Sequence, residues 1–109
     1  MNFLVHLFVS QHDEDLQIGN WMGDLVRNKY ISELPPGIKK GIILHRSIDT
    51  FSDNHNIIRQ GIKRIRDRQQ KYSPVVVDIF YDYLLYNNWN EFSERNFSKF
   101  TSEFYNRLK

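Results

Sequence analysis

Apolar residues recur every three or four positions along most of this 109-residue chain, and that spacing is the strongest constraint on its fold. Between residues 14 and 29, for example, Ile18, Met22 and Leu25 fall on one face of a helix. Runs that alternate apolar and polar residues are lacking, and the sequence has no Asn-Gly or Asp-Gly pair to indicate a β-hairpin. The pattern therefore predicts an all-α protein, a compact bundle of about five to six helices.

Two prolines and their neighbours predict where the longer helices begin. Pro36 follows a Leu-Pro pair and suits the first position of a helix over about residues 36–51. Ser73 followed by Pro74 predicts an N-cap and a first-turn proline, opening an apolar helix that runs to about residue 87.

The remaining segments are shorter or more polar. We expect an apolar helix within residues 2–10, a basic helix over 55–71 and a last helix capped by Asn90. Since no repeat or low-complexity linker divides them, residues 1–109 are expected to form a single helical domain.

Composition excludes several classes of protein. Hydrophobic residues make up 40% and charged residues 26%, as in a folded domain rather than a disordered tail. The chain has no cysteine, which excludes disulfides, thiolate zinc sites and a cysteine nucleophile. The first residues lack the basic start and small-residue cleavage site of a signal peptide, and no apolar stretch reaches membrane-spanning length, so we expect a cytoplasmic protein without a membrane partner.

Ionisable side chains interrupt two of the predicted apolar faces. In the helix that begins at Pro36, Ile38 and Ile42 are continued at helical spacing by His45 and Asp49. A His/Asp pair one turn apart can hold one metal ion, or the carboxylate can orient the imidazole.

The helix after Pro74 carries a second pair, Asp78 and Asp82, within VVVDIFYDYLLY. A buried carboxylate needs a cation, a hydrogen-bond partner or a raised pKa. His6 is likewise the only polar residue between Phe3 and Val9, and Asp24 ends an apolar stretch.

Each of these residues also has a purely structural interpretation. A core histidine such as His6 is commonly hydrogen-bonded to a backbone carbonyl. Asp24 and Asp82 could face water, and Asp53 with His55 fits the turn and N-cap between two helices. As a set, however, oxygen and imidazole groups on four helices suit Mn²⁺, Mg²⁺ or Fe²⁺ better than a structural zinc.

The segment after residue 58 is strongly basic. It contains six cations against a single acid, Asp67: Arg59, Lys63, Arg64, Arg66, Arg68 and Lys71. Such a run can be an ordinary solvated helix face, or it can dock an acidic protein or a phosphate backbone. No aromatic residue interrupts the run, which argues against a nucleic-acid partner that is bound by base stacking.

Several stretches together resemble the acyl carrier protein phosphodiesterase family. They are NFLVHL, IGNWMGDLV, LPPGIKKGIILHRSIDTFSDNH, VVVDIFYDYLL and WNEFSERNFSKF, and they extend over essentially the whole chain. The resemblance implies an all-helical, HD-domain-like fold. It also implies that this chain is the N-terminal part of a longer family fold, because family members continue beyond the position of Lys109.

The activity implied by the resemblance is metal-dependent hydrolysis of the phosphodiester that joins 4′-phosphopantetheine to holo-acyl carrier protein, with Mn²⁺ as the expected metal. The family's polar signature falls on His6, Asp24, His45, Asp49, Asp53, His55, Asp78 and Asp82. Of these, Asp24, His45, Asp78 and Asp82 are the expected metal ligands.

Further roles follow from the same resemblance. We expect Asp24, His6 and Asp49 to act in catalysis. Phosphate or carrier-protein docking is assigned to five basic residues, Arg46, Arg59, Lys63, Arg64 and Arg66.

One residue departs from the family's pattern. The position after Asp82, where a histidine is usual, is Tyr83. If that histidine is a ligand or an acid, its loss weakens or changes the site. Two alternatives to the enzyme therefore stay open, a non-catalytic module that binds acyl carrier protein and a small nucleic-acid-binding domain; a shortened chain could also pair with itself to cover apolar surface.

Overall fold

The computed structural model describes residues 2–11 and 13–109, whose regular secondary structure is entirely helical with no strand, which confirms the all-α prediction. The elements are α1 (Phe3–Val9), α2 (Glu14–Met22), α3 (Asn28–Ile31), α4 (Pro36–Asp53), α5 (Asn56–Gln69), the 3-10 turn η1 (Gln70–Tyr72), α6 (Ser73–Asn87), α7 (Trp89–Phe92) and α8 (Phe97–Leu108). Two of these helices, α3 and α7, are single turns. Within the described ranges no helix is both long and apolar enough to span a bilayer.

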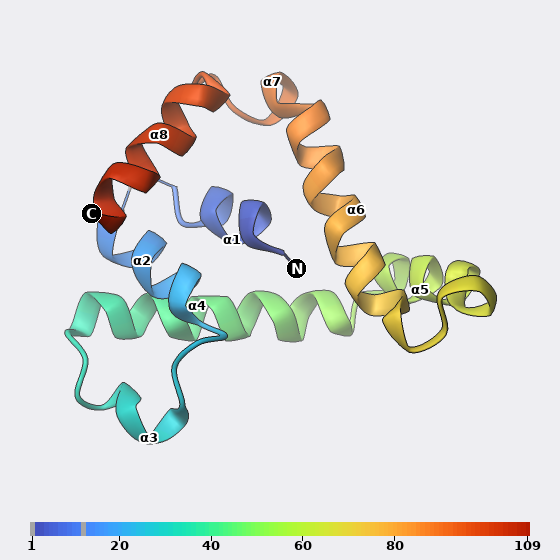
Figure 1. Cartoon of the computed structure of the whole chain (residues 1–109), viewed down its shortest axis with the longest axis horizontal. Coiled ribbons are helices and arrows are strands. Elements are labelled where there is room, and N and C mark those ends of the chain that lie inside the picture. The colour runs from blue at the N-terminus through green and yellow to red at the C-terminus, as the bar shows by residue number, and fades with distance from the viewer. Residues whose placement is uncertain (1, 12) are drawn as a thin grey trace.

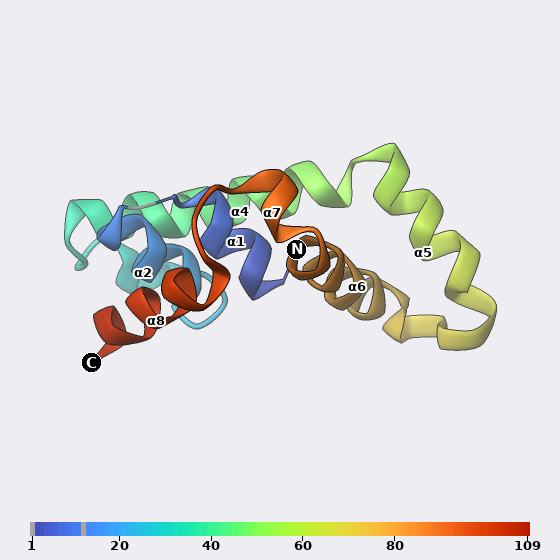
Figure 2. The same cartoon turned by 90° about the horizontal axis from the view of Figure 1, so that it is seen from above.

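The longer helices enclose α1. Figure 1 shows α4, α6 and α8 as three sides of a triangle, with α1 inside it, α2 between α8 and α4, and α5 beside the first turns of α6. The molecule is a slab of 42 × 37 × 21 Å, seen edge-on in Figure 2. Its radius of gyration of 14.9 Å exceeds the roughly 13 Å typical of a compact domain of this length, so the arrangement is open.

The main apolar core joins α1 to the C-terminal helices. Its buried side chains are Leu7, Leu85, Trp89, Phe100 and Phe104. Edge-to-face aromatic contacts organise it, with ring centroids of Phe8 and Trp89 5.5 Å apart. This core fixes α1 against α6 and α8, so the face of α1 that bears His6 is directed at α2 and α4.

Two glycines bring α2 and α4 into backbone contact. A Cβ atom added at Gly41 would lie 2.7 Å from the Cα of Gly19, and one added at Gly19 would lie 2.2 Å from the carbonyl oxygen of Ile38. Side chains at these positions would force the helices apart. Ile42, fully buried, packs beside this crossing.

The helix boundaries differ from the predicted ones at three places. Pro36 does open α4, but the segment 14–29 is not one helix, because α2 ends at Met22. Ser73 is the first residue of α6 rather than its N-cap. Asn90 lies inside the single turn α7, and the cap of the last helix is Asn96, whose side chain accepts a hydrogen bond from the Lys99 N–H.

Candidate metal centre

His45 is held in one orientation by the backbone of α2. Its ring is 2% exposed, and its Nδ1 lies 2.7 Å from the carbonyl oxygen of Asn20. A carbonyl can only accept a hydrogen bond, so Nδ1 carries the hydrogen. The other nitrogen, Nε2, lies 3.0 Å from Asp24 Oδ1 and 3.2 Å from Asp49 Oδ2.

His6 approaches the same carboxylate from α1. Its Nε2 lies 3.1 Å from Asp49 Oδ1, and its ring stacks on that of His45 with centroids 3.9 Å apart and planes within 9° of parallel. Asp49 thus offers one oxygen to each imidazole. Among the described residues, His6, His45 and Asp49 form a group whose ligand atoms all lie within 4.8 Å of one another.

The chemistry of this donor set fits a cation. With a proton on Nδ1, neutral His45 presents a lone pair to two carboxylate oxygens, and such contacts repel unless a positive charge lies between them. Protonation of the ring or a bound metal ion would supply that charge. The bond from Nδ1–H to a backbone carbonyl is the arrangement that metal-binding histidines commonly use, since it fixes the tautomer and the ring.

Burial keeps His6 ready to act as a neutral ligand. The side chain is 1% exposed, and burial, followed by the nearby His45, lowers its pKa below the ordinary 6.5, while Asp49 acts in the opposite direction. At neutral pH the ring therefore has a lone pair to offer a metal rather than a positive charge to repel one.

Asp24 gives the group access to solvent. It follows the C-terminus of α2, and its side chain is 69% exposed although it contacts buried His45. Asp49 is intermediate, at 34%. Two buried imidazoles and two progressively more exposed carboxylates form a site that is closed on one side and open on the other.

Sequence reasoning overlooked the residues that support this site. Asn20 is fully buried, and its Nδ2 donates to the backbone carbonyl of His6 and to Ser10 Oγ, both at 2.8 Å. The backbone carbonyl of Asn20 accepts the hydrogen bond from His45 Nδ1. Gly23 allows the ring of His45 to approach, since a Cβ there would lie 2.2 Å from His45 Cγ. The sequence signal for these supporting residues was a polar residue and a glycine, each about one helical turn from a core-facing position.

Asp78 and Asp82, expected as ligands, lie outside the group of three. Asp82 accepts hydrogen bonds from the backbone N–H groups of Leu4 and Val5, both at 3.0 Å, and so caps the first turn of α1. Burial raises the pKa of half-buried Asp78, and Asp49 and Asp53 are close enough to add smaller contributions in the same direction. Asp78 is therefore an electrostatic neighbour of the site.

The proposed docking residues are exposed. Arg46 faces a shallow surface hollow beside Ile43 and Thr50, on a different face of α4 from His45. Arg59, Lys63, Arg64 and Arg66 are all exposed on α5. Arg59 donates from Nε to the carbonyl oxygen of Asp53 at 3.2 Å.

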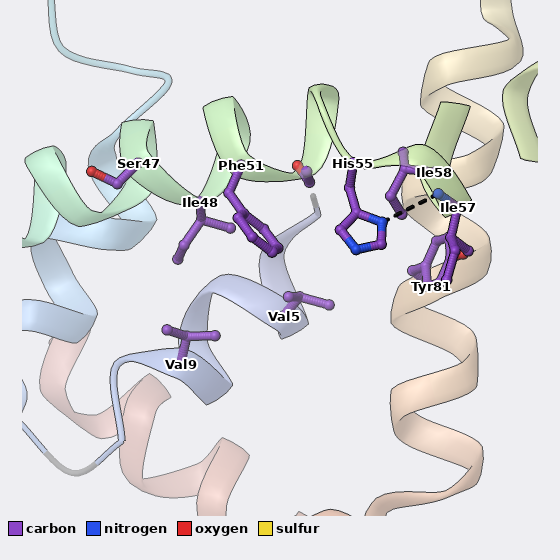
Figure 3. Close-up of a pocket in the computed structure, with 10 residues that line it drawn as sticks. Val5, Val9, Ser47, Ile48, Phe51, His55, Ile57, Ile58 and Tyr81 are labelled. Atoms are coloured by element: carbon purple, nitrogen blue, oxygen red, sulfur yellow. Dashed lines mark hydrogen bonds between the residues drawn. The ribbon is translucent and has the colours of Figure 1, made fainter. Parts of the chain in front are cut away.

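An apolar groove lies next to the candidate centre. Figure 3 shows Ile48 and Phe51 of α4 facing Val5 and Val9 of α1, with Tyr81 of α6 at one end; its volume is about 550 Å³. Val5 and Ile48 are chain neighbours of His6 and Asp49, although neither His6 nor Asp49 lines the groove itself. His55 also lines the groove, where its Nδ1 accepts from the Ile57 N–H as the N-cap of α5.

Comparison with known proteins decides the family. The sequence matches the acyl carrier protein phosphodiesterase family over residues 1–109. The chain belongs to this family. Similar acyl carrier protein phosphodiesterases include that of Salmonella newport (strain SL254), 31% identical, and that of Escherichia coli O45:K1 (strain S88 / ExPEC), 32% identical, each over 93 residues. No solved structure matches the chain significantly.

The chain spans about half the length of these curated relatives. The matched residues are 85% of this chain and 48% of each relative. Tyr83 is not part of the group formed by His6, His45 and Asp49. Its side chain is 55% exposed and lines a hollow between α1, α6 and α8.

Proposed function

We propose that this chain hydrolyses the phosphodiester bond between 4′-phosphopantetheine and the serine of holo-acyl carrier protein, giving the apo form. The proposal rests on one observation above all, the convergence of His6, His45 and Asp49 on a common point in a member of this family. Asp24 completes the open side of the same centre.

His6, His45 and Asp49 would hold a divalent cation, with Asp24 as the exposed fourth group. Mn²⁺ is the proposed metal, and Mg²⁺ and Fe²⁺ suit the same ligands. A cation bound there would polarise a phosphate oxygen and lower the pKa of a water molecule.

The chain's own residues provide orientation and charge. The Asn20 carbonyl fixes His45 with Nε2 directed toward the carboxylates. Asp24 reaches solvent, where it can accept the proton that an attacking water releases. The bond that forms joins the water oxygen to phosphorus, and the bond that breaks joins phosphorus to the serine oxygen, which takes up a proton.

Two surfaces would position the substrate. The apolar groove of Figure 3 offers a place for the organic part of the phosphopantetheine arm next to its phosphate. The cations of α5 would attract an acidic carrier protein and raise its rate of association. Asp78, in electrostatic contact with Asp49, is proposed to tune the centre or to serve as a further ligand.

The test is incubation of the purified chain with holo-acyl carrier protein, with and without Mn²⁺, while mass spectrometry follows loss of the phosphopantetheine. We expect metal-dependent conversion that falls at least about 100-fold in Asp49→Asn, which loses the negative charge of the carboxylate that offers one oxygen to each imidazole. Glu91→Gln is the matched control, since Glu91 is exposed on α7, outside both the centre and the basic helix α5. Conversion by Asp49→Asn at the wild-type rate would contradict the proposed site.

The chain matches only about half the length of its relatives, and this favours a second candidate function, binding without catalysis. A chain that spans 48% of an enzyme's length could bind the carrier without cleaving it. In that case the folded, Mn²⁺-loaded chain would bind holo-acyl carrier protein but leave its mass unchanged.

A further inference from the structure

One face of α6 is apolar and exposed along its whole length. The α6 stripe consists of Tyr72, just before the helix, and Val75, Ile79, Tyr83 and Tyr86 within it. Each of these side chains is 55–61% exposed. Val77, one of the three buried residues of α6, lies on the other side of the helix, while the end of the stripe at Tyr86 borders α8 through a ring contact with Phe97. In Figure 2 α6 lies at the margin of the molecule, with no helix below it.

The spacing of the stripe is that of a helix-pairing seam. Its members follow one another at intervals of three, four, four and three residues, which is the pattern of apolar positions in packed helix pairs. The order of intervals reads the same in both directions. An antiparallel copy of the stripe would therefore match it position for position, with Ile79 at the centre facing its own equivalent.

We propose that α6 is the interface of a twofold homodimer, in which the α6 stripes of two copies pack antiparallel. A two-fold interface uses the same patch on both subunits, so a self-complementary stripe is the surface that such symmetry requires. Tyr72 then faces Tyr86 of the second copy, and Val75 faces Tyr83.

The area available suits a stable dimer. A large side chain that is half exposed offers roughly 100 Å², so the stripe presents roughly 500 Å² per copy. Phe3 and Tyr105, exposed on α1 and α8, line the same hollow of about 490 Å³ as Ile79 and Tyr83, and bring the total to roughly 700 Å². Two copies would bury up to roughly 1,400 Å², within the range of specific interfaces.

Charge does not oppose the contact. The part of α6 from Pro74 to Tyr86 contains two acids and no base, and both acids lie outside the stripe. Asp82, the nearer to the stripe, directs its carboxylate to the N–H groups of α1 rather than toward a second copy. A seam without charged members avoids the desolvation that a buried charge would cost.

Cysteine substitution tests the symmetry, because the chain has no cysteine of its own. Under mild oxidation Ile79→Cys should form a disulfide-linked dimer in high yield, since the two sulfurs face each other across the axis. Tyr86→Cys is the matched control: it is equally exposed, but its two copies lie about 21 Å apart along the paired helices. A mixture of Val75→Cys and Tyr83→Cys should link to each other more than either links to itself.

Light scattering on the unmodified chain completes the test. The mass should be twice 13.2 kDa, and Ile79→Glu should raise the dimer dissociation constant at least about 100-fold, because two carboxylates would meet on the axis. Far-UV circular dichroism of that variant should be unchanged, since Ile79 is half exposed in the single copy. A monomer at every concentration, or equal crosslinking of Ile79→Cys and Tyr86→Cys, would overturn the proposal.

Discussion

Two stacked imidazoles are the most unusual residues of this chain, because each limits the charge of the other. With ring centroids 3.9 Å apart, two positively charged rings would repel strongly. Burial and the presence of His45 both lower the pKa of His6, so the pair favours at most one positive charge. The Asp49 carboxylate between their Nε2 atoms is what makes one positive charge, proton or metal, favourable there.

The lowered pKa of His6 predicts the pH dependence of stability in the metal-free chain. The unfolded histidine titrates near 6.5 and the folded one at lower pH, so between these values only the unfolded chain binds the proton. The free energy of unfolding should therefore be highest above about pH 6.5 and should fall as the pH drops toward the folded pKa. Urea unfolding in a chelator, at several pH values, measures this.

His6→Gln is the comparison that isolates this contribution. The raised pKa of Asp78 acts with the opposite sign, because it removes stability as the pH rises through the folded pKa, but it is common to both proteins. The difference in unfolding free energy between wild type and variant should shrink on acidification. Parallel pH profiles would show that the His6 pKa is not lowered.

Sequence periodicity selected inward-facing ionisable residues, but it did not predict which of them meet. His6, Asp24, His45 and Asp49 stood at the core-facing or terminal positions of three segments, and the structure brings them together. Asp82 fell on an equally convincing stripe, yet it satisfies the N–H groups of α1. Periodicity reports which face of a helix is inward; it cannot distinguish a ligand from a cap.

At the level of elements, the centre depends on how closely α2 and α4 cross. Gly19 lies in α2 and Gly23 directly after its last residue, one turn further along, while Gly41 and His45 are one turn apart on α4. The contact between Gly19 and Gly41 sets the separation of the two helices. The contact between Gly23 and His45 positions the imidazole ring one turn further along. The position of His45 thus depends on the lack of a Cβ atom at Gly19, Gly23 and Gly41.

Gly41→Ala should separate the two helices. Its Cβ would meet backbone atoms, the Gly19 Cα and the Leu16 carbonyl oxygen, both at 2.7 Å, and backbone cannot rotate away as a side chain can. We expect a loss of about 1–3 kcal/mol in unfolding free energy by urea denaturation. Weaker Mn²⁺ binding by calorimetry should accompany it, since the change also moves His45.

Gly61→Ala is the matched control for that change. Gly61 lies within α5, and an added Cβ would meet only the Val77 Cγ2 at 4.0 Å, an ordinary contact. Alanine's better helix propensity should then stabilise the chain by up to about 1 kcal/mol. Equal effects of the two substitutions would contradict the proposed role of the α2–α4 crossing.

The elements themselves were largely predictable, because most of them are long and bounded by strong local signals. Pro36 fixed the start of α4, and the apolar spacing identified α5, α6 and α8. The predicted helix boundaries are wrong at places where tertiary contacts accompany the end or the start of a helix. α2 ends at Met22, directly before Gly23, which contacts the His45 ring. Ser73 already has helical dihedral angles and directs its hydroxyl to the Gln70 carbonyl oxygen of the preceding turn.

The whole molecule is a thin slab with two different kinds of surface. Its 21 Å thickness is about two helix layers, too thin to bury both faces of each helix, which is why the α6 stripe and the groove beside α4 stay exposed. The basic residues are concentrated on α5, at one end of the slab. If α6 pairs with a second copy, α5 and the candidate centre are left for a carrier protein.

Electrostatic docking on α5 predicts salt-sensitive binding of an acidic carrier. Reversing two exposed cations, Lys63→Glu with Arg64→Glu, should weaken binding of fluorescently labelled acyl carrier protein about tenfold or more at about 50 mM salt, mainly through a slower association rate. At about 300 mM salt the difference should shrink, because the screening length is then shorter than the separation of rim charges. Lys40→Glu, an exposed lysine on α4, is the control and should bind like wild type. A double variant that binds normally at low salt would exclude α5 as the docking surface, whatever the centre formed by His6, His45 and Asp49 proves to do.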